Sequence, residues 1–179
     1  MKVLCLAQRH REAMPAATEL LEIRNAMIDS YNRYAQGLDT KDWALVRRCF
    51  ADKVFIDYGS ISDPTGSPDV ARNSDDWMKQ LQAVINGFDI TRHAITNHRP
   101  EITGTSISCT AYLVADHVIF ANPELPIVTP EEVVTVTGEY TNWYELHDGE
   151  CKIIRSRLVV NYTGGNVALL GQAMARAAG

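Results

Sequence analysis

The sequence predicts an α+β fold in which a curved, mainly antiparallel (mixed) sheet wraps around N-terminal helices. Two observations predict this fold. Apolar side chains in the first half of the chain recur mainly at helical spacing, whereas from residue 91 onward the long segments are rich in β-branched and aromatic residues. Helices followed by a run of long strands are typical of α+β domains. Such a sheet is expected to enclose an apolar pocket at one end of its concave side.

The helices are predicted from apolar stripes and from the residues that flank them. Gly37 is expected to end the first helix, because glycine adopts the left-handed conformation of a helix C-terminus. Thr40 suits the N-cap of the second helix, and Asn73 or Ser74 suits that of the third. The expected helices cover residues 16–36, 41–49 and 74–86, with a last one at 168–177.

The strands are predicted from runs of β-branched and aromatic residues between turn signals. The strongest turn signal is Asp148-Gly149, because both residues tolerate the positive φ angles of a tight hairpin. Residues 59–68, which are rich in Gly, Ser and Pro, are expected to form a long loop. The expected strands cover residues 53–58, 93–103, 106–121, 132–146 and 151–162.

The chain of 179 residues has the length of one domain, and no shift in composition divides it. An apolar content of 46% predicts a substantial core. We expect residues 1–15 to form a flexible N-terminal tail, residues 16–163 the folded domain and residues 164–179 a C-terminal helical tail.

Charge and motif content exclude several classes of function. The net charge is −5 and the basic residues are scattered, so no nucleic-acid surface is expected. No apolar run approaches the roughly 20 residues of a membrane helix, so no membrane partner is expected. The four cysteines are far apart, which indicates reduced thiols of a cytoplasmic protein and no metal site. No P-loop, dinucleotide-binding or nucleophile-elbow motif is present, so no cofactor is expected.

Asp39 and His93 are the first candidates for chemistry. Asp39 follows the expected end of the first helix, and His93 begins a long strand. If the fold brings them together, the carboxylate can fix one ring nitrogen of His93 and leave the other free as a base. Each residue also has a structural alternative, because Asp39 could simply flank a helix end and His93 could be a satisfied core histidine.

Three segments resemble one family. Residues 34–55 resemble the opening of SnoaL-like proteins of the nuclear-transport-factor-like superfamily, and residues 91–97 resemble the strand that carries the family histidine. Residues 138–149 resemble a late hairpin of hexachlorocyclohexane dehydrochlorinase. The resemblance covers about residues 16–162 and implies a cone-shaped α+β barrel. It does not imply a single function, because the superfamily holds dehydratases, isomerases, cyclases, a dehydrochlorinase and non-catalytic members.

The resemblance implies catalytic roles for several residues. Asp39 and His93 match the aspartate–histidine pair that removes a proton next to the leaving group in scytalone dehydratase and the dehydrochlorinase. A bile-acid dehydratase carries a tyrosine five residues before this aspartate, as Tyr34 stands here, and a second aspartate on the next long strand, where Asp116 falls. Packing alone could explain Tyr34, and Asp116 could equally face solvent.

An arginine on the last strand also recurs in these enzymes, and both Arg155 and Arg157 are candidates. Regular alternation from Cys151 and Ile153 would place Arg157 on the inner face. Steroid isomerases, which the chain also resembles, use an aspartate close to the position of Asp57, although the register is offset by one residue. The expected substrate-binding residues are Tyr58, Trp77, Tyr112, Asp57 and Trp143.

Two functions follow as hypotheses. The first is a cofactor-independent lyase or isomerase in which the His–Asp pair abstracts a carbon-bound proton from a small, mostly apolar cyclic substrate, such as a steroid, polyketide or aromatic metabolite. The second is a non-catalytic binding or assembly module, as the small subunits of ring-hydroxylating dioxygenases are in this superfamily. The long strands would expose one sheet face, so a homodimer or a larger homo-oligomer is expected.

Overall fold

The computed structural model describes residues 17–59, 67–125 and 127–179. The predicted N-terminal tail, residues 1–15, lies outside them. The elements in chain order are α1 (Ala17–Thr40), α2 (Trp43–Arg48), β1 (Phe50–Asp57), β2 (Arg72–Asn73), α3 (Ser74–Ile85), β3 (Ile90–Thr103), β4 (Ser106–Val118), β5 (Val133–His147), β6 (Glu150–Gly165) and α4 (Ala168–Ala178).

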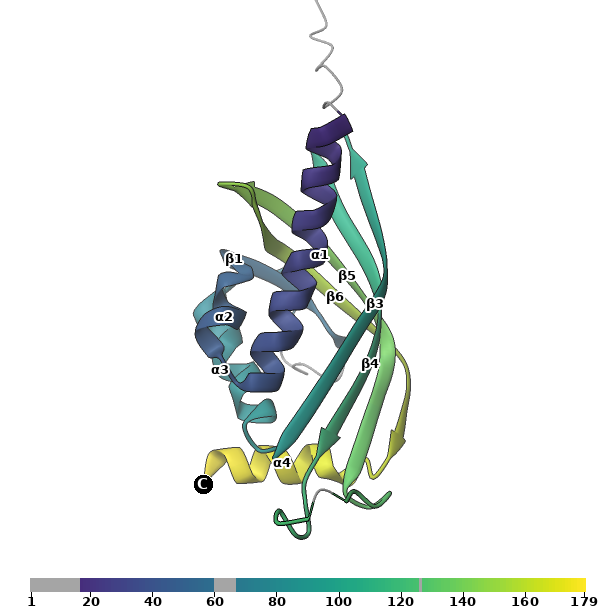
Figure 1. The fold of residues 1–179 in the computed structure, drawn as a ribbon. Helices are drawn as coiled ribbons and strands as arrows, with labels where there is room; N and C mark the ends of the chain where they lie inside the picture. Colours follow the sequence, from purple (N-terminus) through teal and green to yellow (C-terminus); the bar gives the residue numbers. More distant parts are fainter. Residues whose placement is uncertain (1–16, 60–66, 126) are drawn as a thin grey trace, which may run out of the picture.

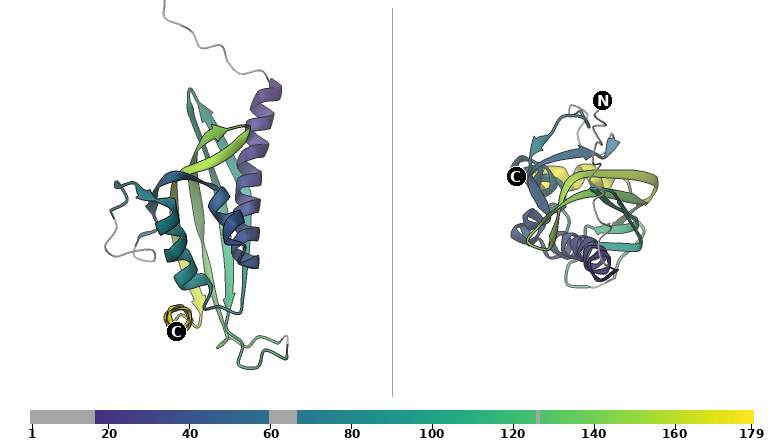
Figure 2. Two further views of the ribbon diagram at one scale, coloured as in Figure 1. Left: turned by 90° about the vertical axis from the view of Figure 1, so that its left-hand side faces the viewer. Right: turned by 90° about the horizontal axis from the view of Figure 1, so that it is seen from above.

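The sheet has six strands in the order β2-β1-β6-β5-β4-β3 and does not close into a barrel. All neighbouring pairs are antiparallel except β1 and β6, which run parallel. The long strands curve strongly, and the helices lie on their concave side (Figure 1; Figure 2). The predicted α+β fold with a mixed curved sheet is confirmed, and Asp148-Gly149 forms the β5–β6 turn with φ angles of 50° and 79°.

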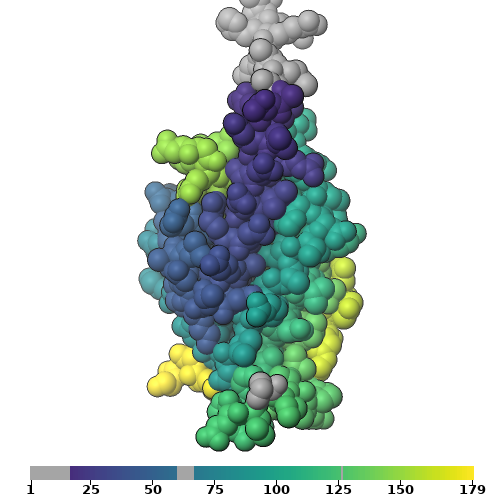
Figure 3. All heavy atoms as spheres, viewed as in Figure 1, coloured from purple at the N-terminus to yellow at the C-terminus, as the bar shows by residue number. Residues whose placement is uncertain are grey.

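The core lies between α1 and the inner face of the sheet. Met27, Tyr31, Tyr34 and Leu38 follow one another at steps of three and four and are all buried. The hydroxyl of Tyr31 donates a hydrogen bond to the backbone carbonyl of Cys109 at 2.7 Å, which ties the middle of α1 to β4. In the space-filling view α1 lies between α2 on one side and the edge strand β3 on the other (Figure 3).

Gly37 does not end α1, contrary to the sequence prediction. The helix continues to Thr40, and Lys41 leaves it with a φ of 55°. A β-carbon on Gly37 would lie 2.6 Å from Cγ2 of Val46. The glycine therefore allows α2 to pack directly against α1, and the extra turn places Asp39 inside a rigid helix.

The N-cap of α2 is Asp42 and not Thr40. The Asp42 carboxylate accepts a hydrogen bond from the backbone N–H of Leu45 at 2.9 Å. The Thr40 hydroxyl instead donates to the carbonyl of Gln36 at 2.8 Å, one turn back in α1. Asn73 caps α3 as expected, through the backbone N–H of Asp75 at 2.8 Å.

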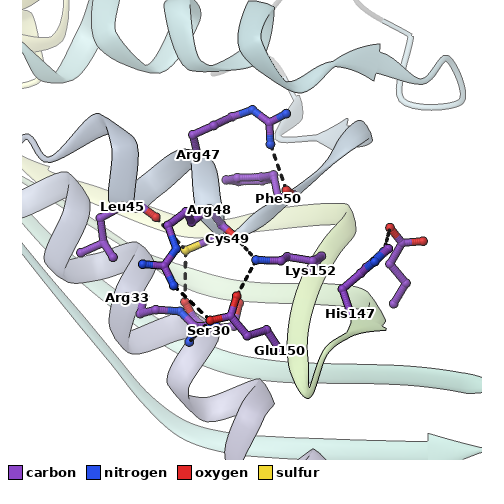
Figure 4. Close-up of polar contacts among 11 residues, drawn as sticks. Ser30, Arg33, Leu45, Arg47, Arg48, Cys49, Phe50, His147, Glu150 and Lys152 are labelled. Carbon is purple, nitrogen blue, oxygen red and sulfur yellow. Dashed lines mark hydrogen bonds and ion pairs between the residues drawn. The ribbon is translucent and has the colours of Figure 1, made fainter.

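A group of charged side chains fastens α1 and α2 to the β5–β6 hairpin (Figure 4). Lys152 donates to the backbone carbonyl of Arg48 at 2.8 Å and to the Glu150 carboxylate at 2.6 Å. Arg48 reaches the same carboxylate at 3.1 Å. Arg33 on α1 lies 3.7 Å from this carboxylate as well. These contacts join α1 and α2 to the start of β6.

The opposite end of the sheet is covered by α4 (Figure 1). Leu169 and Ala173 pack against Phe88 and Val134 in a small second cluster. A β-carbon on Gly87 would lie 1.8 Å from the carbonyl oxygen of Ala173, so this approach requires glycine. No helix in the described ranges is long and apolar enough to cross a membrane.

The convex face of the sheet exposes large apolar side chains. Tyr112 and Val114 on β4 are 46% and 44% exposed, and Val159 and Tyr162 on β6 are 43% and 62% exposed. None of the four helices in the described ranges covers them, because these helices lie on the concave side or at its end (Figure 2). This area is called the convex apolar face below.

Candidate functional site

Asp39 and His93 form a hydrogen-bonded pair between the last turn of α1 and the start of β3. Nδ1 of His93 lies 2.7 Å from Oδ1 of Asp39. The backbone N–H of His93 donates to Oδ2 at 3.0 Å, and the Thr91 hydroxyl donates to Oδ1 at 3.0 Å. The carboxylate is thus held from three directions, and its orientation toward the imidazole is fixed.

The pairing sets the protonation pattern of the histidine. Burial alone would raise the pKa of Asp39, but the hydrogen bonds from the ring and backbone of His93 and from Thr91 outweigh burial and hold this pKa below its ordinary value. An ionised Asp39 accepts a hydrogen bond from Nδ1–H of the neutral imidazole, which leaves the lone pair on Nε2. No described residue hydrogen-bonds to Nε2 of His93. The side chain is therefore oriented as a base with a free nitrogen.

The imidazole of His93 lines a cavity of about 120 Å³ between the helices and the inner face of the sheet. Asp39 lies behind His93 and does not line it. The other lining residues are mostly apolar or aromatic: Tyr34, Leu38, Tyr58, Trp77, Gln80, Leu81, Val84, Ile85, Leu113, Ala115, His117, Val136, Tyr140, Leu158 and Leu170. Among the described residues that line the cavity, none carries a Lys, Arg, Asp or Glu side chain.

Three of the predicted residues, Tyr34, Tyr58 and Trp77, lie in this cavity. The rings of Tyr34 and Tyr58 both pack against Tyr140, with centroids 6.0 and 5.7 Å apart, and Trp77 packs edge-on to Tyr58 at 5.2 Å. The Tyr58 hydroxyl lies 3.0 Å from the hydroxyl of Ser156. Burial raises the pKa of each of the three phenols, so all stay protonated and can donate hydrogen bonds.

His117 is a cavity residue that the sequence reasoning missed. Its ring lies 5.3 Å from that of His93 and 5.0 Å from that of Phe88, and its Nδ1 is buried with no hydrogen-bond partner among the described residues. Burial, together with the nearby His93, lowers the pKa of His117 to about 4. Alternation along β4 would have placed His117 on the same face as Leu113 and Ala115.

This burial predicts a pH dependence of stability. Between pH 6.5 and about 4 the unfolded chain binds a proton at His117 that the folded chain does not, so the free energy of unfolding should fall as the pH is lowered through this window. The effect should reach up to about 3 kcal/mol. Urea unfolding of His117→Gln should show a shallower loss over this window than the wild type, whereas His147→Gln, at an exposed site, should match the wild type. Equal slopes for His117→Gln and wild type would contradict the prediction.

Asp116 and Tyr112 point away from the cavity, so their predicted cavity roles are corrected. They alternate with the buried residues of β4 and are exposed on the convex side of the sheet. Asp116 accepts a hydrogen bond from the Thr135 hydroxyl at 2.6 Å, and the guanidinium of Arg99 stacks on the Tyr112 ring at 4.6 Å. Both side chains have partners on that face.

Asp57, Trp143 and Arg157 also lie on the convex side, and their predicted cavity roles are corrected as well. Together they line a shallow surface depression, in which the Arg157 guanidinium lies 3.5 Å from the Asp57 carboxylate. Asp57 and Trp143 face outward because they alternate with buried neighbours on their own strands. For Arg157 the cause is a bulge in β6. Trp143 pairs with Arg155 but Tyr144 pairs with Ile153, which leaves Ile154 as an extra residue.

Beyond this bulge the alternation of β6 is reversed. Cys151 and Ile153 are buried before the bulge, whereas Ser156 and Leu158 are buried after it. Arg155 therefore faces outward as well, with its guanidinium over the Phe55 ring at 4.7 Å. Neither candidate arginine reaches the cavity, and the inner position between them belongs to Ser156.

Thr91 is a positioning residue for Asp39, which gives a second prediction. Thr91→Val keeps the shape of the side chain but removes the hydroxyl that donates to Oδ1, so the pKa of Asp39 should rise toward its ordinary value. The variant should lose about 1.5 kcal/mol of stability at neutral pH, as is typical of a hydrogen bond to a charged group. Thr91→Ser should restore both properties. An NMR titration of Asp39 checks this, and an unchanged pKa in Thr91→Val would contradict it.

Within the described ranges, no three His, Cys, Asp or Glu side chains are grouped so that they could hold a metal ion. The three cysteines in these ranges, Cys49, Cys109 and Cys151, are buried and unpaired, and burial raises the pKa of each thiol to about 11. The cysteines therefore act as core side chains, and the reactive groups of the cavity are the imidazoles and phenols.

Comparison with protein families decides the classification. The model of the SnoaL-like domain matches residues 19–157, which include the whole of the Asp39–His93 site. The chain belongs to the SnoaL-like domain family. No match was found among curated proteins.

Solved structures show the same fold for this SnoaL-like chain. The Kfla4162 protein of Kribbella flavida is 26% identical, with a TM-score of 0.68 over 89% of this chain and 99% of that one. A candidate scytalone dehydratase from Novosphingobium aromaticivorans is 18% identical, with a TM-score of 0.65 over 84% and 91%. Hexachlorocyclohexane dehydrochlorinase LinA-type3 from Novosphingobium barchaimii LL02 is 16% identical, with a TM-score of 0.65 over 84% and 94%.

Proposed function

We propose that this SnoaL-like protein is a cofactor-independent lyase or isomerase that abstracts a carbon-bound proton from a small, mostly apolar cyclic substrate. The observation that carries the proposal is the 2.7 Å contact between Asp39 and His93, with the free nitrogen of His93 facing an apolar cavity. The names of the structural neighbours, a dehydrochlorinase and a candidate scytalone dehydratase, favour elimination chemistry.

In the proposed mechanism Nε2 of His93 takes the proton from a carbon next to a carbonyl or leaving group. Asp39 keeps Nδ1 protonated and stabilises the imidazolium that forms. Tyr34 donates a hydrogen bond to the oxygen on which negative charge develops, because its buried phenol stays protonated. The proton then returns to another carbon in an isomerisation, or leaves with water or halide in an elimination.

The experiment that tests this proposal detects proton abstraction itself. Neutral cyclic ketones and β-hydroxyketones are incubated with the protein in D2O, and NMR follows exchange of the protons next to the carbonyl, while absorbance follows any new double bond. Wild type should exchange or eliminate at least one compound well above the buffer rate. Exchange that proceeds equally fast with His93→Asn would contradict the assignment of His93 as the base.

The second candidate is a non-catalytic binding module. The buried Nδ1 of His117 has no hydrogen-bond partner among the described residues, and a bound ligand would supply one. The D2O experiment separates the two functions, because a binding module would take up the same compounds without exchanging their protons.

We also propose a homo-oligomer, at least a dimer, assembled through the convex apolar face. Four large side chains between 43% and 62% exposed on β4 and β6, the two strands that flank β5, are an unusual surface for a monomer. Light scattering at micromolar concentration should give at least twice the monomer mass. Val114→Lys should shift the mass toward the monomer, whereas Val70→Lys, at an exposed site in the segment before β2, should not. A wild-type monomer would contradict this prediction.

A further inference from the structure

Two corners of the chain flank the Asp39–His93 pair. The first corner, residues 40–43, leads from α1 to α2 directly after Asp39, and the second corner, residues 86–89, leads from α3 into β3 shortly before His93. Asp39 lies in the last turn of its helix, where the intrahelical hydrogen bonds run out. The position of Asp39 relative to His93 therefore depends on how the first corner is held against the second.

Lys41 joins the two corners. Its ammonium donates a hydrogen bond to the backbone carbonyl of Phe88 at 2.7 Å, and this contact is partly buried. The indole N–H of Trp43 donates to the Asn86 side chain at 3.2 Å, which makes a second, exposed link between the same corners. Because a hydrogen bond from a charged donor is stronger than one between neutral groups, the Lys41 contact is the stronger link.

The second corner is itself held by neighbouring elements. The backbone N–H of Asp89 donates to the carbonyl of Val118 at 2.9 Å. The Asp89 carboxylate accepts hydrogen bonds from the backbone N–H of Phe120 and from the Arg176 guanidinium, both at 2.8 Å. Arg176 is the main cause that lowers the pKa of Asp89, and the nearby Lys41 ammonium adds to it. Lys41 thus reaches a corner that is fixed to β4 and to α4.

The backbone of Lys41 adopts a conformation that favours glycine. Its φ angle is 55°, in the left-handed region, and the residue that follows a helix in this conformation is usually glycine or asparagine. A β-carbon is unfavourable there, and glycine would avoid this cost. A lysine that is kept in a strained conformation indicates that its side chain contributes something glycine cannot supply.

We propose that Lys41 is a positioning residue for the Asp39–His93 pair. Its ammonium holds the end of α1 against the corner that leads into β3, and this keeps the Asp39 carboxylate within reach of Nδ1 of His93. The inference rests on the proposed function, because it gives a part in the same proton transfer to a residue that does not line the cavity. Lys41 acts through the tautomer and orientation of His93.

Three variants of Lys41 separate positioning from folding. Lys41→Met removes the ammonium, Lys41→Gly also relieves the backbone strain, and Lys41→Arg restores a charged donor. Lys41→Met should lower kcat for exchange with the best ketone by roughly tenfold with little change in KM, because a misplaced base slows the reaction without weakening binding. Lys41→Gly should melt at a higher temperature than Lys41→Met and show the same low kcat. Lys41→Arg should recover most of the rate.

The matched control is Lys79→Met, because Lys79 is exposed on α3, where it pairs with Asp76. This variant should keep the full kcat. If kcat recovers in Lys41→Gly together with the melting temperature, Lys41 only stabilises the fold and the proposal is overturned. A wild-type kcat in Lys41→Met would overturn it as well. Lys41→Gly takes the place of Lys41→Met in this comparison if the methionine variant does not fold.

Nitrogen-15 NMR of the His93 imidazole tests the positioning without any substrate. At about pH 8 the ring is neutral, and the wild type should carry its proton on Nδ1, which faces Asp39. Lys41→Met and Lys41→Gly should show roughly twice the wild-type share of the Nε2–H tautomer or more, whereas Lys41→Arg and Lys79→Met should match the wild type. An unchanged tautomer in both of the first two variants would overturn the proposal, whatever their rates.

The tautomer measurement also separates this inference from the proposed catalysis. If Lys41→Met changes the tautomer while the wild type exchanges no protons with any ketone, Lys41 positions the pair and the catalytic function is removed. If the wild type exchanges protons and the tautomer does not depend on Lys41, the catalytic function stands and the role of Lys41 is removed.

Discussion

Replacing His93 by asparagine should lower the rate of proton exchange or elimination by about 10⁴-fold, the upper range for a positioned general base. Asparagine can still place an N–H group near the position of Nδ1, so the hydrogen bond to Asp39 can persist. It carries no basic nitrogen to face the cavity, however. The measurement is the exchange rate in D2O with the best ketone found for the wild type, together with the melting temperature and the mass in solution.

The matched control is His147→Asn, because His147 is exposed at the β5–β6 turn, where its ring pairs with Glu145. This variant should retain the full rate. If His93→Asn folds, keeps its oligomeric mass and exchanges protons as fast as the wild type, another group is the base, and His117 becomes the first candidate because it lies 5.3 Å away.

Asp39→Asn should lower the same rate by about 10² to 10⁴-fold. The amide has nearly the shape of the carboxylate, but it cannot stabilise the imidazolium that forms on proton transfer. The equivalent change in a serine-protease triad costs about 10⁴-fold in kcat. The Asp39 carboxylate also accepts hydrogen bonds from the backbone N–H of His93 and from the Thr91 hydroxyl. An amide NH2 group in place of one oxygen cannot accept such a bond, so it would turn the imidazole of His93 away.

Asp116→Asn is the control for this change, because the Asp116 carboxylate faces the convex side, where it accepts a hydrogen bond from Thr135. It should leave the rate unchanged. A loss at Asp116 comparable to the loss at Asp39 would mean that the convex side contributes to the chemistry. If Asp39→Asn keeps the full rate, the charge of the carboxylate does not contribute to the reaction and the side chain has only a packing role.

The order of helices and strands could be read from the sequence because periodicity and turn chemistry are local properties. The Asp148-Gly149 turn and the Asn73 cap follow from a few residues each. The role of Gly37 could not be read in this way, because the same residue that ends many helices here makes room for Val46, which comes nine positions later. The need for glycine at position 37 comes from a contact between two helices.

The Asp39–His93 pair was expected from the resemblance to related enzymes, and its geometry agrees. The other polar cavity residues could not be assigned because β4 is apolar on both faces: Tyr112 and Val114 lie outside, while Leu113 and Ala115 lie inside. In such a strand neither face is marked as interior. Asp116, a candidate catalytic residue from the resemblance, therefore lies outside, whereas its neighbour His117 lines the cavity.

The bulge at Ile154 has a consequence for how this fold can change during evolution. Cys151 and Ile153 lie inside before the bulge and Ser156 and Leu158 lie inside after it, so the bulge that takes up the extra residue is what keeps Arg155 and Arg157 outside. Deleting that one codon would make the alternation of β6 regular and would leave these side chains on the faces that they have now. A related chain without the extra residue can therefore keep the same neutral cavity, and a comparison that counts residues along β6 without regard to the bulge would place both arginines on the wrong face.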